Sequence, residues 1–176
     1  EGSPGIYAAR AILPPVSVPH TGLNDNNMKT VYLSSFCVSF RDYKRLAEIL
    51  HNCSDFPLGV ELATSWSYPD FDALLEAQVE TFRSVPVTLH APFVEICGAE
   101  GSDELQRMES QFEKAYRWYH LFGATSMVMH THEKKVPPSE RKWMQQRAEA
   151  VILQTAERAR EEGIHLTVEN VGYPLQ

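Results

Sequence analysis

Cysteine is scarce in this chain: only Cys37, Cys53 and Cys97 occur among 176 residues, and none stands in a CxxC or CxH spacing. A disulfide framework and a cysteine-based zinc finger both need more cysteines at closer and more regular spacings. We therefore predict reduced thiols and a cytoplasmic protein.

Long hydrophobic runs and an excess of basic residues are also lacking. No apolar run approaches the roughly 20 residues of a membrane span, and the first residues do not combine a basic with an apolar region as a secretory signal does. The formal net charge is −7, and no expected helix face collects lysine and arginine, as a partner held by phosphate contacts would require. Neither GxGxxG nor GxxxxGKS/T occurs, so nothing predicts a nucleotide cradle. The sequence thus favours neither a membrane nor a nucleic acid as partner.

Residues 1–27 differ from the rest of the chain. They hold four of the eleven prolines and end in Asn24-Asp25-Asn26-Asn27, with no sustained hydrophobic period. We interpret them as an extension without function, either disordered or a non-native leader. The single domain is then expected at residues 28–176, starting at Met28.

From Met28 onward, short β-branched runs alternate with longer amphipathic ones. Strands are expected at residues 30–36, 58–63, 86–91, 125–131 and 164–171, and helices at 40–52, 71–83, 103–122 and 140–162. Gly123 and Gly163 directly follow two of these helices, where a left-handed residue is favoured. Strict alternation predicts parallel strands joined by right-handed crossovers, with strand order 1-2-3-4-5 in a barrel.

The side-chain parity of the strands distinguishes an open doubly wound sheet from part of a closed barrel. A doubly wound sheet carries helices on both faces, so both parities should be apolar. Here one parity is apolar, while the other is smaller or polar and ends in an ionisable residue in the second to fifth strands. The apolar parity consists of Val60, Leu62, Val87, Leu89, Met127, Met129, Leu166 and Val168. This pattern predicts a barrel whose top opens into a site, with Thr88, Ser126 and Thr167 pointing away from the helices.

Four ionisable residues could carry chemistry. Parity and position place Glu61, His90, His130 and Glu169 at the carboxyl ends of four successive strands, all pointing inward. Neutral imidazole and carboxylate are the ligands that Zn²⁺, Mn²⁺ and similar ions accept. A single strand-end histidine is more often structural, but four coincidences in one register predict a polar active site that binds a divalent metal.

Four short motifs at βα spacing carry a family resemblance. They are GVEL at 59–62, HAPF at 90–93, MHTH at 129–132 and LTVENV at 166–171. Their order resembles the xylose-isomerase-like barrels, also called AP-endonuclease family 2, over residues 28–176.

The resemblance implies a (β/α)8 TIM barrel that binds a divalent metal (Zn, Mn, Mg or Co) at its top and acts on sugars or on abasic DNA. In the sugar isomerases and epimerases the fifth-strand glutamate is a metal ligand and often a proton-transfer base, which implies these roles for Glu169. The third- and fourth-strand histidines are zinc ligands in the endonuclease branch and more often line the substrate pocket in the isomerase branch, so His90 and His130 are expected in either role. We expect Glu61 to border the substrate, whereas His132 and Glu95 are interpreted as loop residues.

The leading hypothesis is a metal-dependent isomerase or epimerase of a sugar or sugar phosphate. A proton next to a carbonyl would be abstracted while the metal stabilises the enediolate oxygens. The alternatives are an abasic-site endonuclease, for which residues 133–142 are the only candidate basic loop, and a non-catalytic remnant or partner subunit.

Complete members of the family continue with three more strands, which supply an Asp, a His and a second Glu to the metal. The chain therefore resembles about five βα units, as a fragment or beside an accompanying chain. Five strands leave the first and last edges unpaired. We therefore expect the isolated chain to self-associate or to be marginally stable, to bind divalent metal weakly and to lack isomerase turnover.

Overall fold

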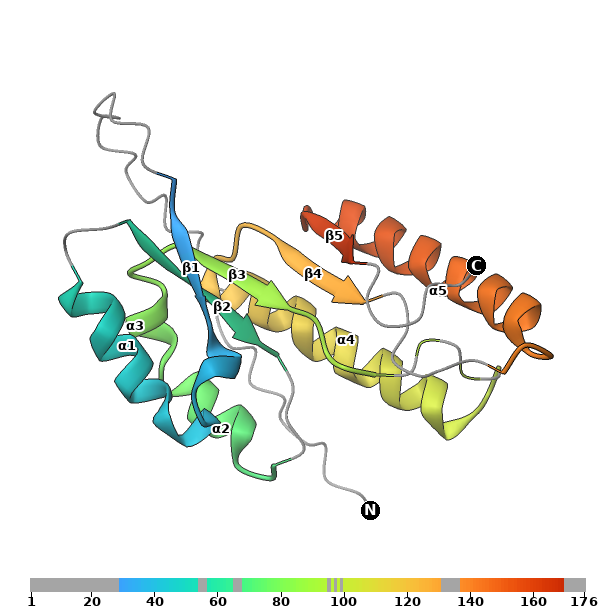
Figure 1. Cartoon of the computed structure of the whole chain (residues 1–176), viewed down its shortest axis with the longest axis horizontal. Helices are drawn as coiled ribbons and strands as arrows, with labels where there is room; N and C mark the ends of the chain where they lie inside the picture. The colour runs from blue at the N-terminus through green and yellow to red at the C-terminus, as the bar shows by residue number, and fades with distance from the viewer. Residues whose placement is uncertain are drawn as a thin grey trace, which may run out of the picture.

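The computed structural model describes residues 29–53, 57–64, 68–94, 96, 98, 100–130 and 137–169. These residues form one parallel sheet in the order β1-β2-β3-β4-β5, which confirms the expected strand order. Figure 1 shows the strands side by side in one curved sheet with the helices packed along its outer side. The strands are β1 (Val31–Ser34), β2 (Leu58–Ala63), β3 (Val87–His90), β4 (Met127–His130) and β5 (Leu166–Glu169). The extension at 1–27 and the end of the last expected strand, 170–171, lie outside the described residues.

The helices follow the expected order with one division. They are α1 (Tyr43–Asn52), α2 (Phe71–Glu76), α3 (Val79–Phe82), α4 (Asp103–Phe122) and α5 (Arg141–Glu161). The single helix expected at 71–83 is therefore wrong in detail, because a turn at Ala77 and Gln78 divides it into α2 and α3. The chain carries neither glycine nor proline at that turn, so no local signal marks it. None of the described helices is both long enough and apolar enough to cross a membrane.

Short 3-10 helices replace the ends of two expected elements near the start. Helix η1 (Ser35–Cys37) follows β1, where the strand was expected to continue to residue 36. Helix η2 (Phe40–Asp42) precedes α1, where the α-helix was expected to begin at residue 40. The Ser39 side chain accepts a hydrogen bond from the Arg41 amide and so begins η2 instead of α1. Helix η1, directly after β1, brings Phe36 to the carboxyl end of the sheet.

The core lies between the sheet and its helices. Val60, Leu62, Val87, Leu89, Met127 and Met129 are almost fully buried there, together with helix residues such as Phe82 and Phe122. Thr88 and Ser126, of the opposite parity, are only half-buried, and Thr167 is exposed. The apolar parity therefore faces the helices, as expected of a barrel strand.

Strand β5 departs from this burial pattern. Leu166 packs against the core, but Val168 of the same parity is 40% exposed. Strand β5 pairs with β4 on one side, and within the described residues no strand covers its other edge. The apolar face of β5 therefore remains partly open.

Candidate metal centre

The site begins with the backbone of His90, the last residue of β3. The His90 carbonyl accepts hydrogen bonds from the Thr64 amide (3.1 Å) and the Thr64 hydroxyl (2.9 Å) after β2. On the other side, the Ala91 amide donates to the Val128 carbonyl of β4 at 2.7 Å. Both neighbouring strands thus fix the point at which the chain leaves β3.

The His90 imidazole is held in one tautomer. Its Nδ1 lies 2.8 Å from the Ala91 carbonyl oxygen, which can only accept, so Nδ1 carries the proton. In neutral His90 the Nε2 atom then presents its lone pair. Burial lowers the pKa of His90 below its usual value because it disfavours the charged imidazolium, although the hydrogen bond to Ala91 acts in the opposite direction. A neutral imidazole with Nε2 unprotonated is the form that binds a metal ion.

His130 and Glu169 are the last residues of β4 and β5, and their side chains lie close to that of His90. The Nε2 atoms of His90 and His130 are 3.0 Å apart, and His130 Nε2 is 3.6 Å from Glu169 Oε2. The β4–β5 register pairs His130 directly with Glu169, which explains this proximity. One ligand atom from each of the three residues lies within 4.8 Å of the other two.

These three residues fit a divalent cation. Two nitrogen ligands of a tetrahedral zinc, each ~2.0–2.1 Å from the ion, are about 3.3 Å apart, close to the separation of the two Nε2 atoms here. Two imidazoles and one carboxylate also form a donor set used by catalytic zinc and related ions. The group could therefore hold a metal ion through His90, His130 and Glu169.

Glu61 borders this group without joining it. On β2 it pairs with Thr88, whereas Ala63 pairs with His90, so Glu61 sits two residues deeper along the strands. Its Oε1 accepts a hydrogen bond from the Ser34 hydroxyl of β1 at 3.4 Å. Its charge acts to raise the pKa of His90, against the larger effect of burial, so the two side chains interact. His132 and Glu95 lie outside the described residues.

The sequence analysis assigned no function to two phenylalanines that lie at the site. Phe93, the last residue of the HAPF motif, stacks on the His90 ring with centroids 4.5 Å apart. Phe36 of η1 meets the His90 ring edge-to-face at 5.2 Å. The HAPF motif itself was the available signal for Phe93. Phe36 gave none, because its approach depends on the 3-10 turn after β1.

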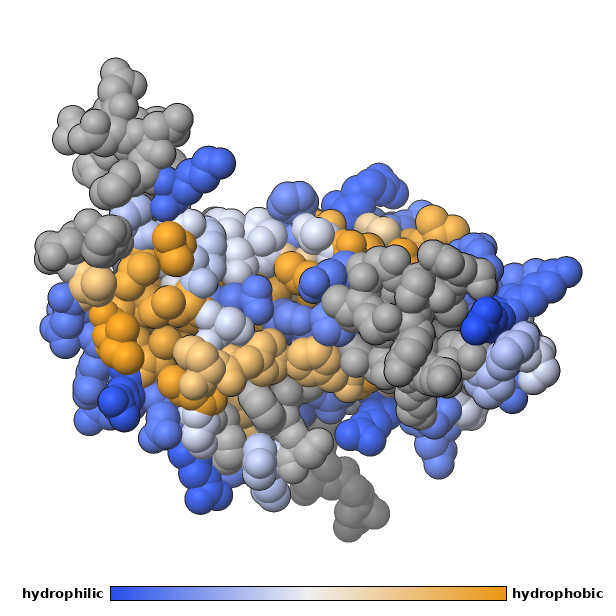
Figure 2. Space-filling model, in the orientation of Figure 1, coloured by the Kyte–Doolittle hydropathy of each residue, from blue (hydrophilic) through white to orange (hydrophobic). Residues whose placement is uncertain are grey.

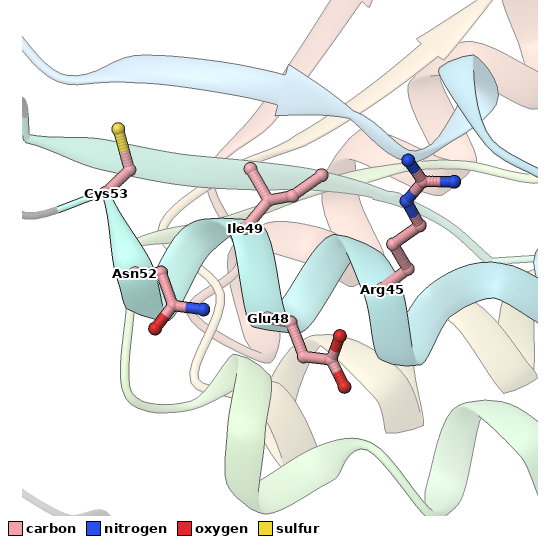
Figure 3. Close-up of a pocket in the computed structure, with 5 residues that line it drawn as sticks. All are labelled: Arg45, Glu48, Ile49, Asn52 and Cys53. Carbon is pink, nitrogen blue, oxygen red and sulfur yellow. The ribbon is translucent and has the colours of Figure 1, made fainter.

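A separate hollow of about 420 Å³ lies on α1, lined by Arg45, Glu48, Ile49, Asn52 and Cys53. Figure 3 shows Arg45, Ile49 and Cys53 on the side of α1 that faces β1. None of these residues belongs to the His90, His130 and Glu169 group. The hollow lies along the side of α1 and forms no part of the candidate metal centre.

Comparison with solved structures identifies the architecture. A D-tagatose 3-epimerase-like protein matches 83% of this chain with 54% of its own, at a TM-score of 0.61 and 17% identity. The TTHB071 protein from Thermus thermophilus, from crystals soaked with ZnCl2, matches 80% of this chain with 55% of its own, at a TM-score of 0.58 and 19% identity. The 3-keto-D-glucoside 4-epimerase of E. coli matches the same shares at a TM-score of 0.52 and 14% identity.

The chain therefore has the α/β fold of these structures, which are TIM barrels. The chain spans about 55% of the length of these structures, and its five parallel strands correspond to a partial barrel. No protein-family model and no curated protein sequence matches the chain. The fold resemblance inferred from the four motifs is thus confirmed by structure.

Proposed function

We propose that this chain forms part of a metal-dependent isomerase or epimerase acting on a sugar or sugar phosphate. The observation that carries the proposal is the convergence of His90, His130 and Glu169 at the carboxyl ends of three adjacent strands. Active sites of (β/α)8 enzymes lie at this end of the barrel. Two of the structures with this fold are described as an epimerase and as epimerase-like.

The residues divide the proposed work between them. His90 and His130 would hold the ion, and Glu169 would be both a ligand and the group that moves a proton next to the substrate carbonyl. A bound divalent ion would polarise that carbonyl and so acidify the neighbouring C–H. Half of the Glu169 side chain is exposed, which allows a substrate to reach the carboxylate. Glu61, bordering the site from β2, would accept a hydrogen bond from a substrate hydroxyl.

The decisive assay follows proton transfer without requiring the sugar to be known. The longest natural polypeptide that contains this sequence is stripped of metal, reloaded with Zn²⁺, Mn²⁺, Mg²⁺ or Co²⁺, and incubated in D2O with a panel of ketoses and ketose phosphates. We expect NMR to detect metal-dependent deuterium incorporation at the carbon next to the carbonyl. Glu169→Gln should lower this rate by ~100-fold or more, as expected for loss of a general base.

Glu109→Gln is the matched control, because Glu109 is an exposed carboxylate on α4 away from the site. Its exchange rate should equal that of the unaltered protein. A polypeptide that binds metal but exchanges no hydrogen in any sugar would contradict the isomerase proposal. A polypeptide that binds no metal would contradict the metal centre itself.

One observation favours a second candidate, a zinc-dependent abasic-site endonuclease. The resemblance implies that the third- and fourth-strand histidines are both zinc ligands in that branch, and here His90 and His130 are 3.0 Å apart at Nε2. Against it stand the net charge of −7 and the small number of basic residues for phosphate contacts. Cleavage of an oligonucleotide with one abasic site, without hydrogen exchange in sugars, would favour this candidate.

A further inference from the structure

Two phenylalanines and the two histidines of the site form a four-ring cluster, composed of Phe36, His90, Phe93 and His130. The rings of His90 and Phe93 are nearly parallel, at 26° with centroids 4.5 Å apart. Phe93 also meets His130 edge-to-face at 5.1 Å and 68°. Phe36 contacts His90 at 5.2 Å and 84°, and Phe93 at 5.2 Å. These separations and angles are the offset-stacked and edge-to-face arrangements that aromatic pairs prefer.

The backbone after β3 explains how Phe93 reaches His90. Pro92 has a fixed φ angle and disfavours the helical conformation at Ala91, so the chain leaves the strand in an extended course. The carbonyl of Ala91 accepts a hydrogen bond from His90 Nδ1, and three residues after the histidine the Phe93 ring lies against its imidazole. The HAPF sequence therefore supplies both the hydrogen-bond acceptor and the stacking partner of its own histidine.

His90 also hydrogen-bonds His130 through Nε2, but a metal ion bound at that atom would displace this bond and leave the ring able to pivot about the Nδ1–H···O axis. The stacked Phe93 ring opposes that pivot, and Phe36 adds a second contact. Phe93 touches His130 as well, so it restrains both imidazoles whose Nε2 atoms are 3.0 Å apart.

We infer that Phe93 is a positioning residue of the candidate metal centre, holding the His90 and His130 rings with their Nε2 atoms directed at one point. The inference rests on the proposed metal centre, and it does not require Phe93 to contact the substrate. Phe93 is 44% exposed, so it contributes less to the core than the buried phenylalanines and can be replaced without emptying the interior.

The test compares Phe93→Leu, which removes the ring, with Phe93→Tyr, which keeps it. Affinity for Zn²⁺ and Co²⁺ is measured by competition with a chromophoric chelator, and the Co²⁺ absorption spectrum reports ligand geometry. We expect Phe93→Leu to weaken metal binding by ~10-fold or more, the range seen when groups that orient metal ligands are lost. Phe93→Tyr should restore affinity and spectrum to within about threefold of the unaltered protein, by the same reasoning.

Trp143→Leu is the matched control, since Trp143 is an aromatic residue on α5 that is 46% exposed. It should leave the metal affinity and the Co²⁺ spectrum unchanged. Unchanged affinity and spectrum in Phe93→Leu would overturn the inference while leaving the metal centre intact.

A readout that needs no metal separates this inference from the function it rests on. Long-range ¹H–¹⁵N NMR of the metal-free protein should show one His90 tautomer, protonated at Nδ1, in the unaltered chain and in Phe93→Tyr. In Phe93→Leu we expect tautomer exchange at His90. If the chain binds no metal, the proposed function fails, and a mixed tautomer in the leucine variant alone would still support the positioning role. A single tautomer in all variants would overturn it.

Discussion

At the scale of single residues, Tyr116 on α4 shows how burial changes the ionisation of a side chain. It is 5% exposed, and burial raises the pKa of its hydroxyl from 10.0 to about 12, although the nearby Arg158 guanidinium acts in the opposite direction. The unfolded chain loses this proton near pH 10, whereas the folded protein keeps it. The unfolded state therefore binds fewer protons between about pH 10 and 12, and the free energy of unfolding falls as the pH rises through that window.

Tyr116→Phe should remove this alkaline loss of stability. Urea unfolding at pH 9 and pH 11 should show a decrease for the unaltered protein that exceeds the decrease for the variant by about 1 kcal/mol. Tyr68→Phe, at an exposed tyrosine, should behave like the unaltered protein. An equal decrease in all three proteins would mean that Tyr116 ionises alike in the folded and unfolded states.

At the scale of elements, α4 has boundaries that its own sequence specifies. The Ser102 hydroxyl accepts a hydrogen bond from the Leu105 amide at 3.2 Å and so satisfies a free amide of the first turn. Asp103 and Glu104 place negative charge in that turn, which the helix dipole favours. Gly123 ends the helix at φ 63°, a conformation that favours glycine.

Ser102→Ala should destabilise the protein by about 1 kcal/mol, because the Leu105 amide loses its acceptor. Chemical denaturation measures the difference. Ser110→Ala on the exposed face of the same helix is the control, and it should change stability by no more than about 0.5 kcal/mol. Equal effects of the two substitutions would show that the cap contributes nothing.

At the scale of the whole molecule, the sheet has two open edges in the part of the chain that the structure describes. Val31 on β1 is 54% exposed and Val168 on β5 is 40% exposed. Figure 2 shows hydrophobic residues gathered where β1 and α1 lie. The side chain of Ile49 on α1 is also exposed. Unpaired edge strands with apolar side chains favour association with another sheet edge.

We propose that the isolated chain self-associates through these edges. Sedimentation velocity over a concentration series should show species larger than the monomer, and Val31→Lys should shift the distribution towards monomer, because a charge on an edge strand opposes pairing. Gln106→Lys on the exposed surface of α4 adds the same charge elsewhere and should leave the distribution unchanged. A monomer at every concentration would contradict the proposal.

The sequence by itself predicted the order of the strands, most of the helices and which ionisable residues end the strands. Alternation of β-branched and amphipathic runs predicts parallel strands, and strand parity with strand-end position indicates Glu61, His90, His130 and Glu169. These features are local, because a period of two along a strand and a residue's distance from its end need no knowledge of neighbours. The turn between α2 and α3 was missed, since no glycine or proline marks it.

Only the tertiary structure decided the distances and contacts between these residues. It brings the Nε2 atoms of His90 and His130 to 3.0 Å and leaves Glu61 two residues deeper along its strand. It also places Phe36 and Phe93 against His90. Such distances depend on strand register, on the curvature of the sheet and on the 3-10 turn after β1. The pairing of strands that are far apart in sequence settles these distances, and a residue's position in its own strand does not specify them.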